Sequence, residues 1–461
     1  MDRATVEPDV TAIPGERAAH WIRYQQQFAA PSTNAYEFVW DLTADAIGPF
    51  CTDVDGNIFL DFTTHVAATP LGYNHPELLD RLEEFELPNP SKIAGQNFYA
   101  GMGSSPDSSV IPGPAQLMDR LTSLTERYGL DTVFLSNSGA EAIENAIKIC
   151  YDDRGGAGQA ITFRGAFHGR TLGALSLNRS RAVHRRDFPE LPGIHAIPYC
   201  KDQTCSPGTC RCGFFPAEDS ISQLREMLDS NRGHIDPRDL AYIIIEPIQG
   251  EGGYRFPSDE FAEEIQAVRE EHDVLLIADE IQTGLGRTGR WWGSDHYAFE
   301  PDVIASGKGL QVGATIARND VFPAEKSRIS STWGGGDVYA IAQGALIIDI
   351  IEEENLLANA RERGEQLKSH LRAADLHGVS NIRGTGLMVA IDLLSKERLD
   401  HTIRAALERG LLTLGCGQRT LRLVPPLDIT KREIRLGADI LIDSINDTTT
   451  NGLGIDPTSI I

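Results

Sequence analysis

A lysine in the stretch DVIASGKGLQVG, residues 302–313, has the surroundings of a buried nucleophile. Lys308 stands between Gly307 and Gly309, among small and apolar residues. Lysine is normally a surface residue, and burying its ammonium group without a partner is costly. The alternative is a lysine that merely turns a corner. We interpret Lys308 as an amine placed in a dry pocket, where it could bond a carbonyl carbon.

An acidic pair follows a second apolar run, in VLLIADEIQTG. The residues Val274–Ala278 predict a strand, and Asp279 and Glu280 stand at its end. A carboxylate at the end of a buried parallel strand points into the ligand crevice of an open α/β sheet. A helix cap or a surface loop is the alternative. Because the strand is hydrophobic throughout, we expect the acid to face a partner.

Two further segments could supply an anion site and an aromatic surface. In SNSGAEAIENAIK, the small residues Ser138, Gly139 and Ala140 precede a helix. The N–H groups at its N-terminus could hold a phosphate, although a plain N-cap is the commoner case. In RGAFHGRTLG, Phe167 and His168 could lie flat over a planar ring. A core phenylalanine beside a satisfied histidine is the alternative.

Together these groups match the needs of one cofactor, pyridoxal 5'-phosphate. It requires an amine that bonds its aldehyde, an anion site for its phosphate and a stacking surface for its ring. It also requires an acid that keeps its pyridine nitrogen protonated, so that the ring can accept electrons from a substrate C–H bond. Each segment is ambiguous alone. Their coincidence predicts a pyridoxal-phosphate enzyme.

The elements that must position these residues alternate along the chain. Short apolar runs such as AYIIIEPIQ and VLLIADEI alternate with amphipathic segments. This pattern predicts βαβ units and a mostly parallel sheet covered on both faces, in a large α/β domain over 76–335. Residues 1–75 and 336–461 should form a smaller α+β domain. We expect a hairpin around Asp55–Gly56 and one long helix from about residue 338.

The motifs resemble those of the class III pyridoxal-phosphate aminotransferases. NSGAEAIENAIK, FHGRT, EPIQGEGG, ADEIQTGLGRTG and SGKGL occur in this order, and the resemblance covers roughly residues 40–445. It implies the aspartate-aminotransferase-like fold, fold type I, which has a large domain with a mostly parallel sheet of the seven-stranded type and a smaller α+β domain. It also implies a homodimer with its active sites at the subunit interface.

The resemblance implies a role for each matched residue. Lys308 would bond the cofactor and later shuttle a proton, Asp279 would bond the pyridine nitrogen, and Gln282 would approach the ring hydroxyl. Phe167 would stack on one ring face, with Ile281 beneath the other. Many members have SGTEA where this chain has SGAEA, so Ala140 could offer the phosphate only its backbone N–H. The remaining implied cofactor contacts are Ser138, Gly139, Ala140, His168, Glu246 and, from the partner subunit, Thr332.

The resemblance also bears on the substrate. Glu251 and Arg422 resemble a gate pair in which the arginine, once released, grips the α-carboxylate of glutamate; a surface ion pair is the alternative. Arg170 stands where lysine 6-aminotransferases hold the substrate carboxylate, and GKGLQVG and STWGG resemble their segments. We therefore expect transfer of an ω-amino group, from lysine by preference, to 2-oxoglutarate, giving a semialdehyde and glutamate. The donors 4-aminobutyrate, ornithine and acetylornithine stay open, as does a racemase or aminomutase reaction.

A cluster of cysteines lies outside these motifs. Four of the seven cysteines fall within 13 residues, at Cys200, Cys205, Cys210 and Cys212. Four thiols could hold zinc, but the spacing x4, x4, x1 is not the paired CxxC pattern. The sequence favours a surface loop with free or occasionally oxidised thiols and no bound metal. Changing all four to serine should then reduce stability without abolishing activity.

The overall charge limits the partners. The chain has 461 residues and a net charge of −24, which repels nucleic acid and anionic membranes and disfavours a DNA-binding regulator. Of its 42 basic residues only 8 are lysine, and such an acidic, lysine-poor surface suits a halophilic protein in concentrated salt. The chain has no apolar run of membrane-spanning length and no secretory h-region at its start, so we expect a cytoplasmic protein.

Overall fold

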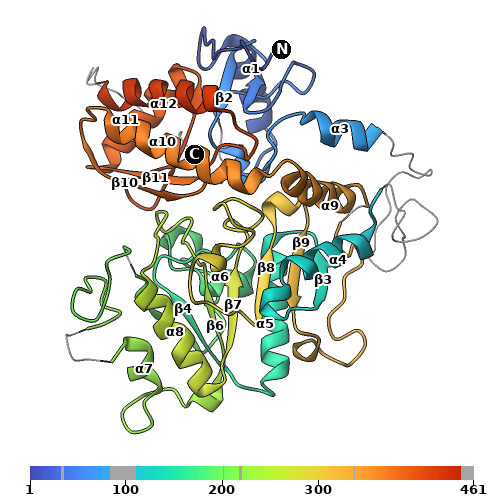
Figure 1. Ribbon diagram of the computed structural model, residues 1–461, viewed down its shortest axis with the longest axis vertical. Coiled ribbons are helices and arrows are strands. Elements are labelled where there is room, and N and C mark those ends of the chain that lie inside the picture. Colours follow the sequence, from blue (N-terminus) through green and yellow to red (C-terminus); the bar gives the residue numbers. More distant parts are fainter. Residues whose placement is uncertain (33–35, 84–110, 201, 217–220, 337, 448–461) are drawn as a thin grey trace. The chain divides into compact units, whose positions relative to one another are not determined.

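A computed structural model of the protein describes all residues except 33–35, 84–110, 201, 217–220, 337 and 448–461. The chain divides into two compact units (Figure 1). One unit combines Met1–Pro76 with Asn355–Ile461, and the other is Glu77–Glu354. Chain ends that are far apart in sequence therefore build one unit, and the middle of the chain builds the other.

The second boundary between the units lies at Glu354–Asn355, and the prediction that placed it at residue 336 was wrong. The single long helix expected from about residue 338 is in fact two helices, α9 (Val338–Glu353) and α10 (Leu356–Ala373). Asn355, between them, has a φ of 54°, in the left-handed region that asparagine tolerates better than most residues. Because α9 packs against α4 (Pro114–Leu124), it belongs to the unit Glu77–Glu354.

A seven-stranded sheet forms the centre of the unit Glu77–Glu354, in the order β3-β9-β8-β7-β6-β4-β5. The strand β9 runs antiparallel to β3 and β8, whereas all pairs from β8 to β5 are parallel. The predicted mostly parallel sheet is therefore confirmed. The strands are β3 (Thr132–Ser136), β4 (Gln159–Phe163), β5 (Ile194–Ile197), β6 (Leu240–Ile245), β7 (Leu275–Asp279), β8 (Val303–Ser306) and β9 (Gly313–Ala317).

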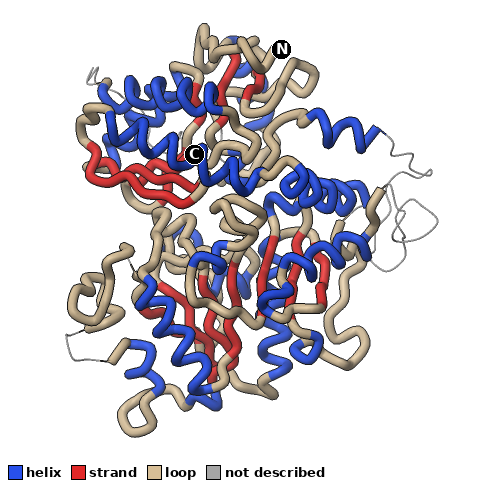
Figure 2. The backbone as a smooth tube through the Cα atoms, viewed as in Figure 1, coloured by secondary structure: helices blue, strands red, loops and turns tan. Residues whose placement is uncertain are grey.

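Alternate residues of the interior strand β6 enter different hydrophobic cores. Ile243 and Ile245 pack with apolar residues of α8 (Asp259–His272), and Ile244 packs with those of α5 (Gly139–Asp153). Helices thus cover both faces of the sheet, as Figure 2 shows for the blue helices on either side of the red strands. Burial on both faces explains why these strands are continuous apolar runs instead of alternating ones. The remaining helices of the middle of the chain are α3 (Pro76–Glu83), α6 (Leu172–Leu177) and α7 (Gln223–Leu228).

The other unit contains two smaller sheets. The predicted hairpin is present, because β1 (Phe50–Thr52) pairs antiparallel with β2 (Ile58–Asp61), and β12 (Leu411–Leu412) joins β2 in parallel. A four-stranded antiparallel sheet has the order β10-β11-β14-β13. Its strands and the other elements of this unit are β10 (Val379–Thr385), β11 (Met388–Leu393), β13 (Leu414–Cys416), β14 (Thr420–Leu423), α1 (Glu16–Gln26), α2 (Thr64–Ala67), α11 (Lys396–Glu408) and α12 (Lys431–Asn446).

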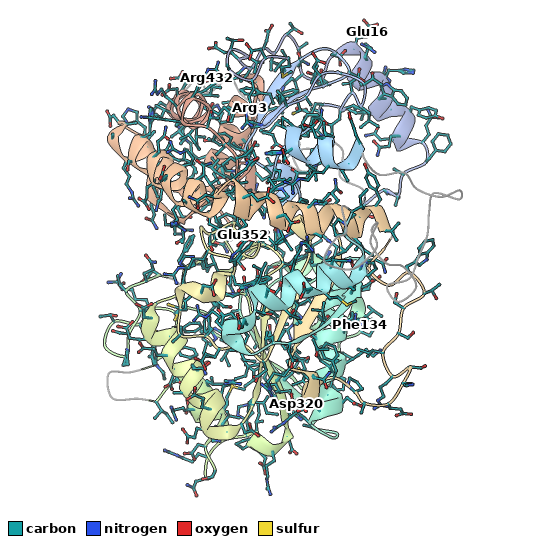
Figure 3. The ribbon with its side chains drawn as sticks, turned by 45° about the vertical axis from the view of Figure 1, so that its right-hand side comes forward. Arg3, Glu16, Phe134, Asp320, Glu352 and Arg432 are labelled. Atoms are coloured by element: carbon teal, nitrogen blue, oxygen red, sulfur yellow. The ribbon has the colours of Figure 1, made fainter. Side chains whose placement is uncertain are left out.

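Ion pairs tie the N-terminal segment to the C-terminal one. The Arg3 guanidinium lies 2.5 Å from Asp428 and 2.7 Å from Glu433, both nearly buried. Arg432, on α12, donates a hydrogen bond of 2.8 Å to the carbonyl of Val6. Figure 3 labels Arg3 and Arg432 within this unit. These contacts explain how two distant parts of the sequence make one unit.

In the part of the chain that the structure describes, each helix is too short or too polar to span a lipid bilayer.

Candidate active site

A cavity of about 340 Å³ lies where the strands β6, β7 and β8 end. Ligands of open α/β sheets bind at this edge, and the volume falls within the usual range of small-molecule sites. The lining consists of Gly139, Ala140, Phe167, His168, Gly169, Arg170, Glu246, Ile248, Glu251, Asp279, Ile281, Gln282, Thr283 and Lys308. The fold therefore brings most of the predicted site residues into one place.

Lys308 occupies a strained backbone position directly after β8. It begins a short 3-10 turn, Lys308–Leu310, and has a φ of 48°. The left-handed region costs a residue with a Cβ on the order of 1 kcal/mol, so the surrounding structure must enforce this conformation. Its half-buried side chain contributes to the cavity lining. Strain of this kind clusters at functional sites, which agrees with the predicted role of the amine.

Asp279, the last residue of β7, is only 4% exposed and is held by two hydrogen bonds. Its Oδ2 lies 2.8 Å from Nδ1 of His168, and its Oδ1 accepts the N–H of Ile281 at 3.1 Å. We expected His168 to share the ring surface with Phe167. The structure shows in addition that the His168 imidazole hydrogen-bonds the Asp279 carboxylate and so orients it.

The neighbouring carboxylate, Glu280, has a different environment. It accepts hydrogen bonds from the N–H of Gly293 at 2.8 Å and from both the N–H and the hydroxyl of Ser294 at 2.7 Å. The Thr283 hydroxyl also donates to it. Burial raises the pKa of Glu280, while these bonds act to lower it. Glu280 therefore stabilises the turn at Gly293 and Ser294, and of these two neighbouring acids Asp279 is the one that lines the cavity.

Glu246 follows β6 and connects two loops of the site. Its carboxylate accepts the N–H of Phe167 at 3.0 Å and the N–H of Gly250 at 2.9 Å. The pKa of Glu246 is raised to about 7, chiefly by burial and in part by the charge of Asp279, although His168 and the two backbone hydrogen bonds act to lower it. The sequence indicated a cofactor contact here. The structure adds that Glu246 holds the backbone of Phe167, the residue predicted to stack on the ring.

The start of α5 can hold an anion. Ser138 caps this helix, and its hydroxyl accepts the N–H of Glu141 at 3.2 Å. A Cβ at Gly139 would lie 2.8 Å from Cδ1 of Ile281, so a side chain there would force the two segments apart. With Gly139 and Ala140 in the lining, the N–H groups of the first helical turn stand beside the cavity, where they and the helix dipole favour a phosphate.

These residues fit pyridoxal 5'-phosphate. Among the residues that the structure describes, the buried Oε1 atom of Gln282 finds no hydrogen-bond partner, and leaving such an acceptor unsatisfied is costly. The ring hydroxyl of the cofactor is a donor of the required kind. Lys308 offers the amine for its aldehyde, Asp279 the acid for its pyridine nitrogen, and the start of α5 the site for its phosphate.

Several predicted residues lie outside this lining in the described part of the chain. Ser138 uses its hydroxyl as the helix cap, Thr332 is exposed, and Arg422 is 4% exposed on β14 of the other unit. The roles predicted for Thr332 and Arg422 stay predictions. Cys200, Cys205, Cys210 and Cys212 lie in the loop that precedes α7.

The sequence analysis did not single out three of the lining residues, Gly169, Ile248 and Thr283. Each lies within a motif that it did use: FHGRT, EPIQGEGG and ADEIQTG. Membership of these motifs was therefore the sequence feature that could have indicated them. A motif alone does not show which of its residues face the cavity.

The sequence model of the family described as aminotransferase class-III matches residues 33–445. The chain belongs to this family. An acetylornithine aminotransferase from Archaeoglobus fulgidus is 33% identical over 406 residues, which cover 86% of this chain and 93% of that protein. An alanine/serine racemase from Pyrococcus horikoshii is 30% identical over 96% of this chain and 93% of its own length.

A solved structure, the lysine aminotransferase from M. tuberculosis in the internal aldimine form, is also similar to this class III aminotransferase. It has a TM-score of 0.79 and 29% identity, and the match covers 93% of this chain and 99% of that chain. Class III aminotransferases depend on pyridoxal phosphate, in agreement with the fit of the cavity. The predicted family, fold and cofactor are therefore confirmed.

Proposed function

We propose that this aminotransferase moves the ω-amino group of a diamino or ω-amino acid, with lysine preferred, to 2-oxoglutarate. The products are a semialdehyde and glutamate. The observation that carries this proposal is that Arg170 and Glu251 line the same cavity as Lys308. An arginine grips a carboxylate with two hydrogen bonds, and an acid can neutralise an arginine until a substrate carboxylate replaces it. The likeness to a lysine aminotransferase supports lysine as the donor.

In this proposal, each residue of the cavity has a separate role in the reaction. When bound, the cofactor supplies an electron sink for the electrons of the breaking C–H bond. The Lys308 amine would carry the proton from the substrate carbon to the cofactor carbon, and Asp279, oriented by His168, would hold a proton at the pyridine nitrogen. Phe167 offers its ring face, and the Arg170 guanidinium carbon lies 5.5 Å from the centroid of that ring.

The two substrates carry different charges, so the pocket must change between the half-reactions. In our proposal, Glu251 neutralises Arg422 while the ω-amine is bound and releases it when glutamate binds. Arg422→Ala should then harm the half-reaction with glutamate far more than the half-reaction with the ω-amine. Stopped-flow rates for the two half-reactions test this, and equal losses would dismiss the gate.

A panel of amino donors with 2-oxoglutarate tests the main proposal. Lysine, ornithine, acetylornithine and 4-aminobutyrate are compared by the glutamate formed, and lysine should give the highest kcat/KM. Arg170→Ala should raise the KM for lysine about 10-fold or more, because a charge-assisted grip on the carboxylate is lost. Arg164→Ala is the control, since Arg164 is exposed and outside the lining. Failure of every donor to yield glutamate would contradict the proposal.

A racemase reaction is the second candidate, because a relative with that name matches 96% of this chain. Racemisation returns the proton to the same carbon and needs no amino acceptor. Incubating L-amino acids without 2-oxoglutarate and measuring the D-enantiomer separates the two reactions. We expect no D-enantiomer, and glutamate in a 1:1 ratio to consumed donor when 2-oxoglutarate is present.

We further propose a cytoplasmic homodimer that works in concentrated salt. Exposed Thr332 would contact the phosphate bound to the partner subunit, and the net charge of −24 would be screened by salt. Light scattering after size exclusion should give twice the mass of 50.4 kDa. Activity should rise with KCl concentration, and full activity in dilute buffer would contradict the salt proposal.

A further inference from the structure

Three cysteine side chains converge on one point outside the Lys308 cavity. Cys205, Cys210 and Cys212 lie in the loop between β5 and α7. The sulfur of Cys212 is 3.6 Å from that of Cys205 and 3.3 Å from that of Cys210, and all three sulfurs lie within 4.8 Å of one another. The spacing of these cysteines differs from the paired CxxC pattern of zinc sites, so the sequence alone does not predict that their sulfurs meet.

The separations match a single tetrahedral ion. Zinc–sulfur bonds of about 2.3 Å in a tetrahedron place neighbouring sulfurs about 3.8 Å apart, close to the distances observed for Cys212. A disulfide requires sulfurs about 2.05 Å apart and would leave one of the three thiols without a partner. Soft thiolates in a tetrahedral arrangement select zinc over hard cations such as magnesium.

Backbone amides point at two of the sulfurs. The N–H of Phe214 donates to the sulfur of Cys212 at 3.4 Å, and the N–H of Phe215 donates to that of Cys210 at 3.3 Å. Gly213 allows this geometry, because its φ of 90° turns the chain back toward the sulfurs. Such bonds stabilise thiolates, which are the form that binds metal, and hold them in place.

The cluster is sheltered and tied to the core. Cys205 is 3% exposed, and Cys210 and Cys212 pack against the core that contains Phe214 and Phe261. The carbonyl of Cys205 accepts the hydroxyl of Ser258 at 2.5 Å, and the same hydroxyl caps α8 by accepting the N–H of Phe261. An ion in this loop would therefore fix the start of the helix that precedes β7.

We propose that Cys205, Cys210 and Cys212 bind one structural Zn²⁺ ion. Cys200, which precedes them in the same loop and donates its thiol to the carbonyl of Asp202, or a solvent molecule completes the tetrahedron. The site would stabilise the loop and the adjoining core, because metal binding to a folded site adds to folding free energy. It would take no part in the reaction at Lys308.

Metal analysis of the cofactor-loaded enzyme tests the proposal. The protein is purified, equilibrated with ZnCl₂ and dialysed extensively, and its zinc is measured by mass spectrometry of the elements. We expect about one ion per chain. Cys205→Ser, Cys210→Ser and Cys212→Ser should each lower retained zinc about 10-fold or more. Cys416→Ser is the control, because this buried cysteine lies in the other unit, and it should keep the full zinc content.

A second measurement does not depend on the variants folding well. Stripping the unmodified enzyme with a chelator should lower its Tm, and adding ZnCl₂ should restore it. Cobalt substitution should give the visible bands of a tetrahedral thiolate complex. The proposal is overturned if the unmodified enzyme retains no zinc, if the three variants retain as much as the control, or if intact mass shows a disulfide among these cysteines in the purified protein.

Discussion

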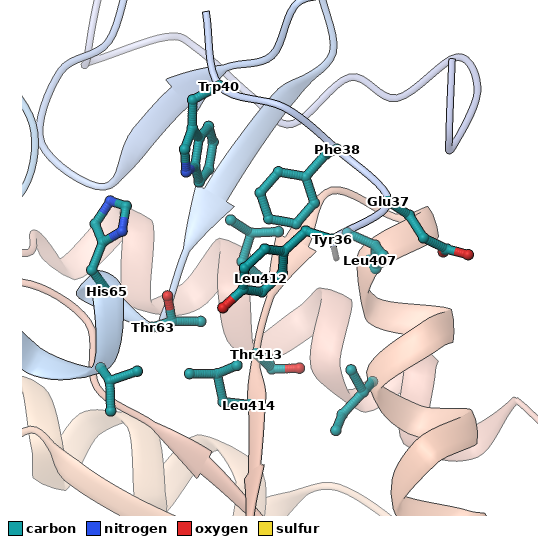
Figure 4. A pocket seen from close by; sticks show the side chains of 12 residues that line it. Tyr36, Glu37, Phe38, Trp40, Thr63, His65, Leu407, Leu412, Thr413 and Leu414 are labelled. Carbon is teal, nitrogen blue, oxygen red and sulfur yellow. The ribbon is translucent and has the colours of Figure 1, made fainter. Parts of the chain in front are cut away.

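Two cavities, one in each unit, differ in what lines them. The Lys308 cavity gathers ionisable groups from the ends of several strands, including Glu246 and Asp279. The cavity of the other unit, of about 130 Å³, is lined mainly by aromatic and aliphatic side chains, with Phe38, Trp40 and Leu412 facing it (Figure 4). Converging buried charges reduce stability and serve chemistry, whereas apolar contacts stabilise the fold. Substitutions in the two cavities should therefore have separable effects.

The largest effect should come from Lys308→Ala. Loss of the amine removes both the covalent attachment and the proton carrier, so turnover should fall by about 10⁴-fold or more. The visible absorbance of covalently bound cofactor should disappear, while the Tm of the cofactor-free protein changes little. Lys148→Ala, an exposed lysine of α5, is the matched control and should keep full activity. Retained turnover in Lys308→Ala would contradict the assignment of the chemistry to the Lys308 cavity.

Asp279→Ala should reduce turnover by about 10²–10³-fold and weaken cofactor binding, because the pyridine nitrogen loses its charged partner. Steady-state rates and cofactor titration measure both changes. Glu280→Gln makes the comparison sharper, since its partners are Gly293, Ser294 and Thr283. It should lower the Tm and keep the cofactor. If the two variants behaved alike, the separate roles of the neighbouring acids would be wrong.

Leu412→Ala should lower the free energy of unfolding by about 2–4 kcal/mol, because the variant leaves a void in the apolar lining. Leu412 is 5% exposed and packs with Cys51, Phe59 and Leu407. Its kcat at low temperature should stay within about twofold of the parent value. Denaturant unfolding and initial rates give the two numbers. A large loss of kcat with unchanged stability would show that the second cavity also serves the chemistry.

The smallest effect should appear in the pH dependence of stability. Burial raises the pKa of Glu246 from 4.5 to about 7. Between these values the folded state keeps a proton that the unfolded state has lost, so stability from this group falls as the pH rises from about 4.5 to 7. In the cofactor-free protein, Glu246→Gln should flatten this part of the profile of Tm against pH. An unchanged slope would contradict the assignment.

The sequence predicted what depends on local pattern. The apolar run before Asp279 indicated a buried strand ending at the ligand edge, and SNSGAEA indicated the helix start at Gly139. The hairpin at Asp55–Gly56 followed from its turn residues. Lys308 could be recognised because lysine between two glycines in an apolar segment is chemically out of place.

Features that depend on tertiary contacts could not be predicted in this way. The helical pattern continues across Asn355, and only the backbone conformation reveals the break between α9 and α10. The bond between His168 and Asp279 joins residues 111 positions apart. The convergence of Cys205, Cys210 and Cys212 depends on how an irregular loop folds back. The spacing of these cysteines in the sequence does not predict that conformation.

The most direct test identifies the lysine that carries the cofactor. The enzyme loaded with pyridoxal phosphate is reduced with borohydride, digested and mapped by mass spectrometry, which locates the added mass on one peptide. The mass should fall on Lys308 at one equivalent per chain. Modification of another lysine, or a chain that binds the cofactor without forming any reducible bond, would contradict the central claim.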